Sequence, residues 1–242
     1  MTPILFLHAF PLDASMWESE VETLSGETTV VAPHLPGFGG AEPAGDVTTM
    51  DAIADAGVAA LDAAGVDRAV VVGCSMGGYA AFSLWRNHRD RVAGLGLVDT
   101  RAEADDEAGR ERRAQLAEKV RAEGSDLVAD SPPPLLTEDA DPALWDRVKE
   151  AIRRQPAEAI AAASLGMAER IDSTPILGEI DVPTTVIVGS ADALTPPPLS
   201  ESMAQAIPEA KLVVLEGAGH LSNLEAPKEF LEAIRGLLAR VG

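Results

Sequence analysis

The chain has 242 residues, 46% of them hydrophobic, and its 39 acidic against 19 basic side chains give a formal net charge of −20 at pH 7. This size and apolar content suit one large α/β domain or two small ones, and they exclude a disordered chain or a mini-protein scaffold. The acidity argues against nucleic acids and anionic membranes as partners, because both require a basic surface.

The cysteine content and the N-terminal segment indicate a cytoplasmic protein. The single cysteine cannot form an intrachain disulfide, so the fold does not depend on an oxidising compartment. Residues 1–8 lack the basic region and cleavage site of a secretory signal. No apolar run approaches the roughly 18 residues of a membrane-spanning helix. We therefore expect no membrane anchorage, and the sequence predicts no particular oligomeric state.

Short apolar segments rich in β-branched residues recur along the chain, and segments with helical spacing separate them. The six predicted strands are Ile4–Leu7, Thr29–Ala32, Ala69–Val72, Val92–Val98, Thr184–Val188 and Leu212–Leu215. Continuous apolar strands between amphipathic helices are typical of a parallel sheet covered on both faces. The sequence therefore predicts an α/β fold with a doubly wound, mostly parallel sheet.

Helices are predicted between these strands, at Met16–Leu24, Thr49–Ala64, Met76–Asn87, Leu199–Ala206 and Asn223–Val241. Asp13 and Asn223 are suitable N-caps, because their side chains can accept hydrogen bonds from the free amides of a first helical turn. Gly65 stands where a glycine commonly ends a helix.

The alternation of strand and helix stops between Asp99 and Thr184. About 80 residues there carry helical patterns only, with an N-cap and first-turn proline at Asp141-Pro142 and a further helix start at Gln155-Pro156. We expect residues 101–180 to form a helical cap over one end of the sheet. Residues 1–100 and 181–242 would then form the core domain.

The first chemical signal is the sequence GCSMGG at residues 73–78, directly after the predicted strand Ala69–Val72. It matches G-x-S-x-G in the context of strand, sharp turn and helix, which predicts Ser75 as a nucleophile. The backbone N–H of Met76 would then face the site from a helix N-terminus and stabilise an oxyanion. A dinucleotide loop or a P-loop is disfavoured, because the required glycine spacing and lysine are absent. Cys74 is interpreted as a small buried side chain.

A serine nucleophile needs a base, and His220 is the favoured candidate. It follows the last predicted strand, so it lies at the carboxyl edge of the sheet together with Ser75. His34, in a loop after the second predicted strand, is the alternative, whereas His88 follows a helix and is expected in solvent.

The base needs an orienting carboxylate, and two aspartates follow predicted strands. Asp192 comes directly after the penultimate strand, and the order Ser75, Asp192, His220 is the order expected of a triad built on such a sheet. Asp99 ends the strand Val92–Val98 and reaches the same edge. We favour Asp192 and expect Asp99 to cap the start of the insertion.

The loop after the first predicted strand can supply a second oxyanion donor. This loop reads His8-Ala9-Phe10-Pro11, and the backbone N–H of Phe10 is the predicted donor. His8 would order the loop without acting as a base, or it would be an ordinary histidine at a strand end.

Taken together, these motifs resemble the α/β-hydrolase family over nearly the whole chain. The residues that carry the resemblance are His8-Ala9-Phe10, Pro36-Gly37-Phe38-Gly39, the segment 73–78, Asp192 and Gly219-His220. The chain looks like the short serine-dependent branch with arylesterases, cofactor-free haloperoxidases and 3-oxoadipate enol-lactonases. The resemblance implies an α/β-hydrolase fold with a helical cap, a triad of Ser75, His220 and Asp192, and oxyanion donors at Phe10 and Met76.

The predicted activity is hydrolysis of small esters, with lactones next, through an acyl-enzyme and without metal or organic cofactor. Perhydrolase and C–C hydrolase activity on the same triad remain open, as does a slow or non-catalytic ligand-binding protein. The cap offers apolar candidates for a pocket wall, although such residues are more often core between cap and sheet: Leu135, Leu136, Trp145, Leu165 and Met167. A substrate carboxylate would need a cation such as Arg101, Arg153 or Arg154, which are otherwise solvated surface residues.

Overall fold

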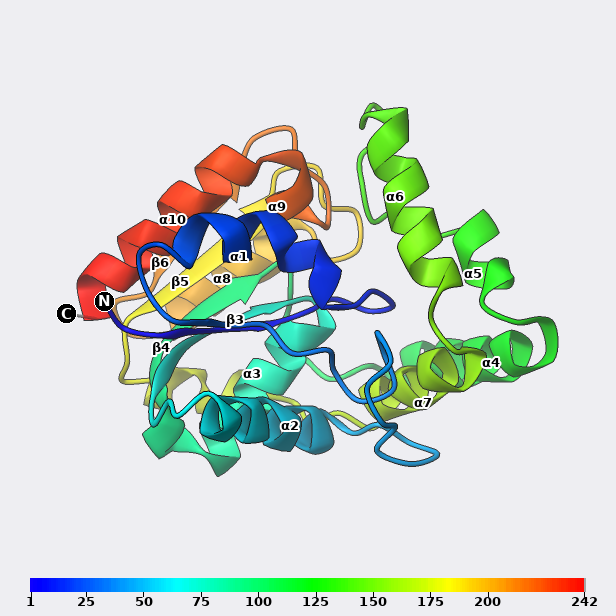
Figure 1. Ribbon diagram of the computed structural model, residues 1–242, viewed down its shortest axis with the longest axis horizontal. Helices are drawn as coiled ribbons and strands as arrows, with labels where there is room; N and C mark the ends of the chain where they lie inside the picture. The colour runs from blue at the N-terminus through cyan, green and yellow to red at the C-terminus, as the bar shows by residue number, and fades with distance from the viewer. Residues whose placement is uncertain (242) are drawn as a thin grey trace.

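The computed structural model describes residues 1–241 and centres on one six-stranded sheet in the order β2-β1-β3-β4-β5-β6, with every neighbouring pair parallel (Figure 1). The strands are β1 (Ile4–Leu7), β2 (Val30–Val31), β3 (Ala69–Cys74), β4 (Val92–Val98), β5 (Thr184–Gly189) and β6 (Lys211–Leu215). The predicted doubly wound parallel sheet is confirmed. The strand order reverses between β1 and β3, and ligand sites of such sheets form at the carboxyl ends beside this switch point.

Helices cover both faces of the sheet. On one face lie α2 (Met50–Ala63) and α3 (Met76–Asn87), and on the other lie α1 (Glu18–Leu24) and α10 (Pro227–Val241) (Figure 1). The helix α8 (Pro197–Ala206) packs against β5 and β6. The strands β1, β3 and β4 are fully buried, which explains why their sequences are continuously apolar.

Two predicted helices are each divided in the structure. The segment expected as Met16–Leu24 is a 3-10 helix η1 (Ala14–Trp17) followed by α1. The segment expected as Asn223–Val241 is a short α9 (Ser222–Glu225) followed by α10, because Pro227 disfavours helical backbone in the residue before it.

The predicted helix caps have mixed outcomes. Asp13 accepts a hydrogen bond from the Ser15 N–H and caps η1 as predicted. Gly65 has a φ of +67° just after α2, also as predicted. The prediction for Asn223 is wrong, because Asn223 lies inside α9 and its Nδ2 donates to the Met16 carbonyl at 3.1 Å.

Four further helices lie beyond the carboxyl ends of the strands (Figure 1): α4 (Glu107–Glu123), α5 (Asp126–Asp130), α6 (Pro142–Arg153) and α7 (Ala157–Ala168). Two 3-10 helices, η2 (Arg89–Arg91) and η3 (Thr174–Glu179), precede β4 and β5. The helix α4 packs on α7, and α5 packs on α6. Of the helices in residues 1–241, none has both the length and the apolar character that crossing a membrane requires.

A buried ion cluster connects the two ends of this helical segment to the core. The Asp105 carboxylate accepts hydrogen bonds from Arg101 and Arg113, each at 2.5 Å, and pairs with Arg170 at 2.8 Å. The Arg170 guanidinium also lies 4.3 Å from the ring centroid of Tyr79 in α3. Burial opposes ionisation of Asp105, but the hydrogen bonds from Arg170 and Arg113 outweigh it and hold its pKa well below the usual range. The cluster therefore fixes residues 101–113 and 170 against α3.

A second buried carboxylate has no such partners. Glu20 in α1 is fully buried, and neither of its carboxylate oxygens accepts a hydrogen bond within residues 1–241. Burial raises the pKa of Glu20 to about 7. The folded state therefore holds this proton more tightly than the unfolded chain, so stability falls as the pH rises from about 4.5 to about 7.

We expect Glu20→Gln to raise the free energy of unfolding at pH 8 by about 2 kcal/mol and to change it little at pH 5. The neutral amide replaces a carboxylate that must ionise in a buried position at the higher pH, where burial outweighs the opposing effects of Asn223 and Arg147, whereas at pH 5 the folded carboxyl is already neutral. Thermal unfolding of both proteins at the two pH values measures this, with Glu22→Gln on the exposed side of the same helix as the control. Equal shifts at pH 5 and pH 8 would contradict the prediction.

Candidate active site

Ser75 sits at the sharp turn between β3 and α3. Its φ of +53° lies in the region that L-residues rarely adopt, and its backbone N–H donates to the Val98 carbonyl at 2.9 Å. A Cβ on Gly73 would lie 2.1 Å from the Gly77 oxygen, and a Cβ on Gly77 would lie 2.1 Å from the Leu7 oxygen. Glycine at both positions is therefore a steric requirement of this turn, which presents the Ser75 hydroxyl at the carboxyl edge of the sheet.

His220 and Asp192 come from neighbouring loops and complete a hydrogen-bonded line with Ser75. The Ser75 Oγ is 2.8 Å from His220 Nε2, and the His220 Nδ1 is 2.8 Å from Asp192 Oδ2. The His220 loop follows β6, and the Asp192 loop follows β5. Both side chains are almost completely buried. The structure thus brings together the three residues predicted as a triad, with the His220 imidazole between the Ser75 hydroxyl and the Asp192 carboxylate.

The Asp192 carboxylate is held by its own loop. Its Oδ1 accepts the backbone N–H groups of Leu194 and Thr195 at 2.8 and 2.9 Å, and its Oδ2 accepts the Thr195 hydroxyl at 2.6 Å. Burial would raise the pKa of Asp192, but the hydrogen bonds from His220 and Thr195 outweigh it and lower the pKa below its ordinary value. Thr195 was not among the predicted site residues. The spacing Asp-x-x-Thr could have indicated it, because a hydroxyl three residues on can reach the carboxylate.

Asp99, the alternative candidate for the triad acid, accepts its hydrogen bonds from Gly189 and Ser222. Its Oδ1 accepts the Gly189 N–H at 2.9 Å, and its Oδ2 accepts the N–H and hydroxyl of Ser222 at 3.0 and 2.5 Å. Burial raises the pKa of Asp99 to about 7. The expectation that Asp99 caps the insertion is wrong, because its oxygens connect the end of β5 to the start of α9. Asp99 therefore supports the loop that carries His220.

The predicted oxyanion donors occupy the loops after β1 and β3. In the part of the chain that the structure describes, the backbone N–H groups of Phe10 and Met76 donate to no protein acceptor. His8 is buried behind the first loop, where the Leu35 N–H donates to its Nε2 at 3.0 Å and its Nδ1 lies 3.0 Å from the Ala9 carbonyl. Burial lowers the pKa of His8 to about 4, so the ring is neutral and its Nδ1–H donates to Ala9. These contacts agree with a role of His8 in ordering the loop.

The other histidines and Cys74 do not contact the Ser75 hydroxyl, although the Cys74 Sγ lies 3.9 Å from the His220 carbonyl. His34 accepts the Ala14 N–H at its Nδ1, 3.3 Å away, and His88 pairs with Asp55 at 2.7 Å on the surface. Cys74 is completely buried, and this burial raises the pKa of its thiol well above the ordinary value. It therefore has the character of a packing residue.

The five apolar residues considered for a pocket wall belong to the packing of the core. Leu135, Leu136 and Met167 are buried, and Trp145 and Leu165 are half-buried against the hydrophobic core. Within residues 1–241, no three side chains of His, Cys, Asp or Glu gather in a way that could hold a metal ion. The expectation that no cofactor is needed stays a prediction.

Comparison with known proteins places the chain among enzymes of one architecture. A family model described as alpha/beta hydrolase fold matches residues 2–227. A thermophilic esterase from Thermogutta terrifontis, solved with malate bound, is 42% identical with a TM-score of 0.95, and the match covers 100% of this chain and 90% of that one. A 3-oxoadipate enol-lactonase of Acinetobacter baylyi is 29% identical over 98% of this chain and 89% of its own length. A pimeloyl-[acyl-carrier protein] methyl ester esterase of Neisseria meningitidis is 31% identical over 92% of this chain and 88% of its own.

Proposed function

The chain belongs to the α/β-hydrolase family and is a hydrolase of the carboxylic ester type, and we propose that it cleaves small esters through an acyl-enzyme on Ser75. The observation that carries the proposal is the line of two 2.8 Å contacts from Ser75 Oγ through His220 to Asp192. The similarity to proteins named esterases and enol-lactonases supports it. Lactones, which are cyclic esters, are the second candidate substrates.

In the proposed mechanism, His220 Nε2 takes the proton of Ser75 as the hydroxyl attacks the ester carbonyl. The N–H groups of Phe10 and Met76, which have no protein acceptor within residues 1–241, bind the developing oxyanion. His220 then protonates the leaving alcohol. A water molecule activated by the same imidazole attacks the acyl-enzyme, and the acid departs.

Asp192 keeps its charge throughout this cycle. Its carboxylate holds the Nδ1 proton of His220, so that Nε2 faces Ser75 as an acceptor, and it stabilises the imidazolium once the proton has moved. Its lowered pKa supports this role, because the group stays ionised at any pH where the imidazole can act as a base. We further propose that the helices α4–α7 act as a cap over the carboxyl edge of the sheet and exclude water from the site.

The test is steady-state hydrolysis of p-nitrophenyl acetate and butyrate, combined with labelling by a fluorophosphonate. We expect many turnovers per enzyme molecule, and one phosphonyl group on the tryptic peptide that contains Ser75. A single turnover, together with a ligand-dependent rise in melting temperature, would instead indicate a binding protein that retains the triad. Labelling of another residue would remove Ser75 from the nucleophile role.

A further inference from the structure

A single buried amide group connects the helices above the sheet to two loops of the core. Gln155 lies between α6 and α7 and is 2% exposed. Its Nε2 donates to Asp13 Oδ2 and to the Ala151 carbonyl, both at 2.8 Å, and its Oε1 accepts the Gly39 N–H at 2.9 Å. Both polar atoms of the amide therefore have protein partners, as a polar group at this burial requires.

The Asp13 partner of this amide is an ionised carboxylate. Asp13 is buried and caps η1, where its Oδ1 accepts the Ser15 N–H at 2.9 Å. Burial would raise the pKa of Asp13, but the hydrogen bonds from Ser15 and Gln155 outweigh it and lower the pKa below its ordinary value. A hydrogen bond to a charged acceptor is stronger than one between neutral groups, so the contact from Gln155 to Asp13 is a firm one.

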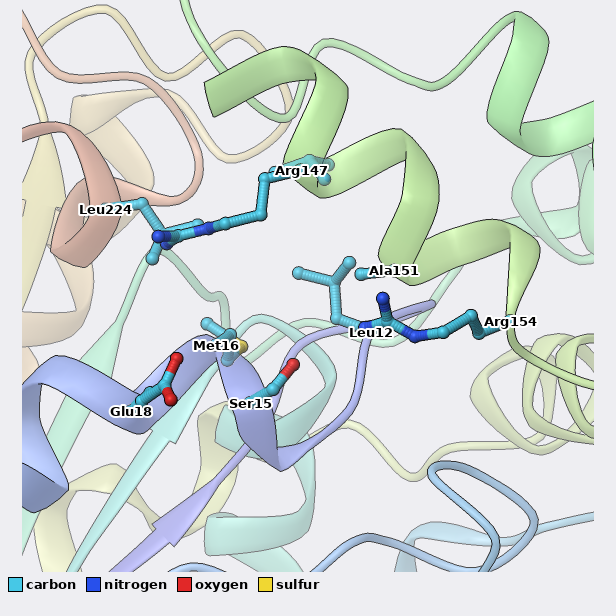
Figure 2. A pocket seen from close by; sticks show the side chains of 9 residues that line it. Leu12, Ser15, Met16, Glu18, Arg147, Ala151, Arg154 and Leu224 are labelled. Atoms are coloured by element: carbon cyan, nitrogen blue, oxygen red, sulfur yellow. The ribbon is translucent and has the colours of Figure 1, made fainter. Parts of the chain in front are cut away.

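The contacts of Gln155 span a gap in the packing between α6 and η1. A cavity of about 240 Å³ lies there, with Ala151 on the wall from α6 and with Leu12 and Ser15 on the opposite wall (Figure 2). Ala151 accepts a hydrogen bond from Gln155, and Ser15 donates one to Asp13. Two surfaces separated by a cavity lack the close contacts that would fix their spacing. The hydrogen bonds of Gln155 therefore set the distance between α6 and η1.

The same contacts close a ring around Phe10, whose backbone N–H is a proposed oxyanion donor. Asp13 follows Phe10 by three residues in the loop after β1. The Phe10 ring lies edge-on to the Phe38 ring with the centroids 6.5 Å apart, and Phe38 directly precedes Gly39. Gln155 thus restrains the backbone of this loop through Asp13 and the Phe10 side chain through Gly39 and Phe38.

No second side chain duplicates this connection. Within residues 1–241, the bonds from Gln155 to Asp13 and Gly39 are the only side-chain hydrogen bonds that join residues 101–180 to residues 1–45. A backbone bond from the Thr48 N–H to the Ala162 carbonyl, at 3.0 Å, joins the two parts of the chain beyond the Phe10 loop. A displacement of the helices above the sheet would therefore reach the Phe10 loop through the Gln155 amide.

We propose that Gln155 is a positioning residue for ester hydrolysis, which holds the Phe10 N–H where the oxyanion forms and makes that position depend on the placement of the helices α4–α7. This inference rests on the proposed function, because Gln155 takes part in no chemical step itself. An oxyanion donor acts only within hydrogen-bonding distance of the developing charge, and a displacement of about 1 Å can cost about 100-fold in rate. The contribution of Gln155 is therefore expected in the transition state and not in the binding of the ester.

Gln155→Met is the main test, because methionine is also long and unbranched but forms none of these hydrogen bonds. We expect kcat for p-nitrophenyl butyrate to fall by about 10- to 100-fold while KM stays within about 3-fold. The Ki of the trifluoromethyl ketone of the same acyl length, whose adduct with Ser75 carries an oxyanion, should rise in parallel with the fall in kcat. Ser164→Ala is the matched control, because it removes a buried 3.0 Å hydrogen bond to the Arg113 carbonyl that stays between α7 and α4. Equal losses of kcat in the two variants would overturn the inference.

A reciprocal exchange tests whether the contact with Asp13 carries the effect. Gln155→Glu places a carboxylate oxygen against the Asp13 carboxylate and is expected to lower kcat at least as much as Gln155→Met. Adding Asp13→Asn supplies the amide donor from the opposite side and is expected to raise kcat by at least about 5-fold over Gln155→Glu alone. A double variant no more active than Gln155→Glu would overturn the assignment.

Amide hydrogen exchange keeps the inference separate from the proposed function. Peptides that cover residues 9–16 and 36–41 should exchange at least about 10-fold faster in Gln155→Met than in the wild type, and at the wild-type rate in Ser164→Ala. Full activity of Gln155→Met would overturn the positioning role and leave the esterase intact. Absence of Ser75-dependent hydrolysis in the wild type would overturn the proposed function, and the exchange rates would then decide whether Gln155 restrains the Phe10 loop. Unchanged exchange of both peptides would overturn that restraint.

Discussion

Replacing Ser75 by Ala is expected to lower kcat for p-nitrophenyl butyrate by roughly 10⁴- to 10⁶-fold. The substitution removes the one oxygen that His220 Nε2 contacts at 2.8 Å and leaves the rest of the turn in place. Catalysis by the oxyanion donors and by binding alone is expected to persist as the residual rate. Steady-state kinetics at pH 8 on protein purified separately from the wild type measures the loss.

Cys74→Ala provides the control for this experiment. Cys74 is the neighbouring residue and the only other side chain in this turn with nucleophilic chemistry, but it is completely buried and its thiol pKa is raised. We expect its activity to stay within a few-fold of the wild type. If Ser75→Ala retained a tenth of the activity, or if Cys74→Ala lost as much as Ser75→Ala, the acyl-enzyme on Ser75 would be excluded.

Much of the fold and the turn at Ser75 could be predicted because their determinants are local. Continuous apolar strands identify the parallel sheet, and the glycines at 73 and 77 follow from backbone atoms that come within 2.1 Å of any added Cβ. The division of the predicted helix Asn223–Val241 into α9 and α10 was not predicted, although Pro227 is a local signal for it.

The rest of the site depends on contacts between segments distant in sequence. Asp99 and Asp192 both follow strands that end at the same edge, and only the positions of Gly189 and Ser222 show which carboxylate is occupied elsewhere. The hydrogen bond that Gln155 Nε2 donates to Asp13 Oδ2 spans 142 positions of the chain, and no local sequence pattern indicates it.

The cations suited to a carboxylate also depend on tertiary structure. Of the three arginines considered from sequence, Arg101 pairs with Asp105 and Arg153 pairs with Asp126 and Asp130, whereas Arg154 donates no hydrogen bond within residues 1–241.

A pair of variants distinguishes the two aspartates, and the expected effects differ by orders of magnitude. Asp192→Asn is expected to lower kcat by about 10⁴-fold, because an amide donating to His220 Nδ1 would move the ring proton to Nε2, where it faces Ser75. Asp99→Asn is expected to retain most of the activity per folded molecule. It should instead lower the free energy of unfolding by about 1–3 kcal/mol, because one of its donors, Gly189 or Ser222, would meet an amide N–H₂ group.

The measurement is kcat at pH 8 together with urea unfolding for both variants. At this pH Asp99, with its pKa of about 7, is mostly ionised in the wild type, so the comparison is between a carboxylate and an amide at both positions. If Asp99→Asn lost more activity than Asp192→Asn at equal folded fraction, Asp99 would be the acid that orients His220. A large loss of stability with little loss of kcat in Asp99→Asn would instead show that Asp99 holds the loop and that Asp192 orients the imidazole of His220.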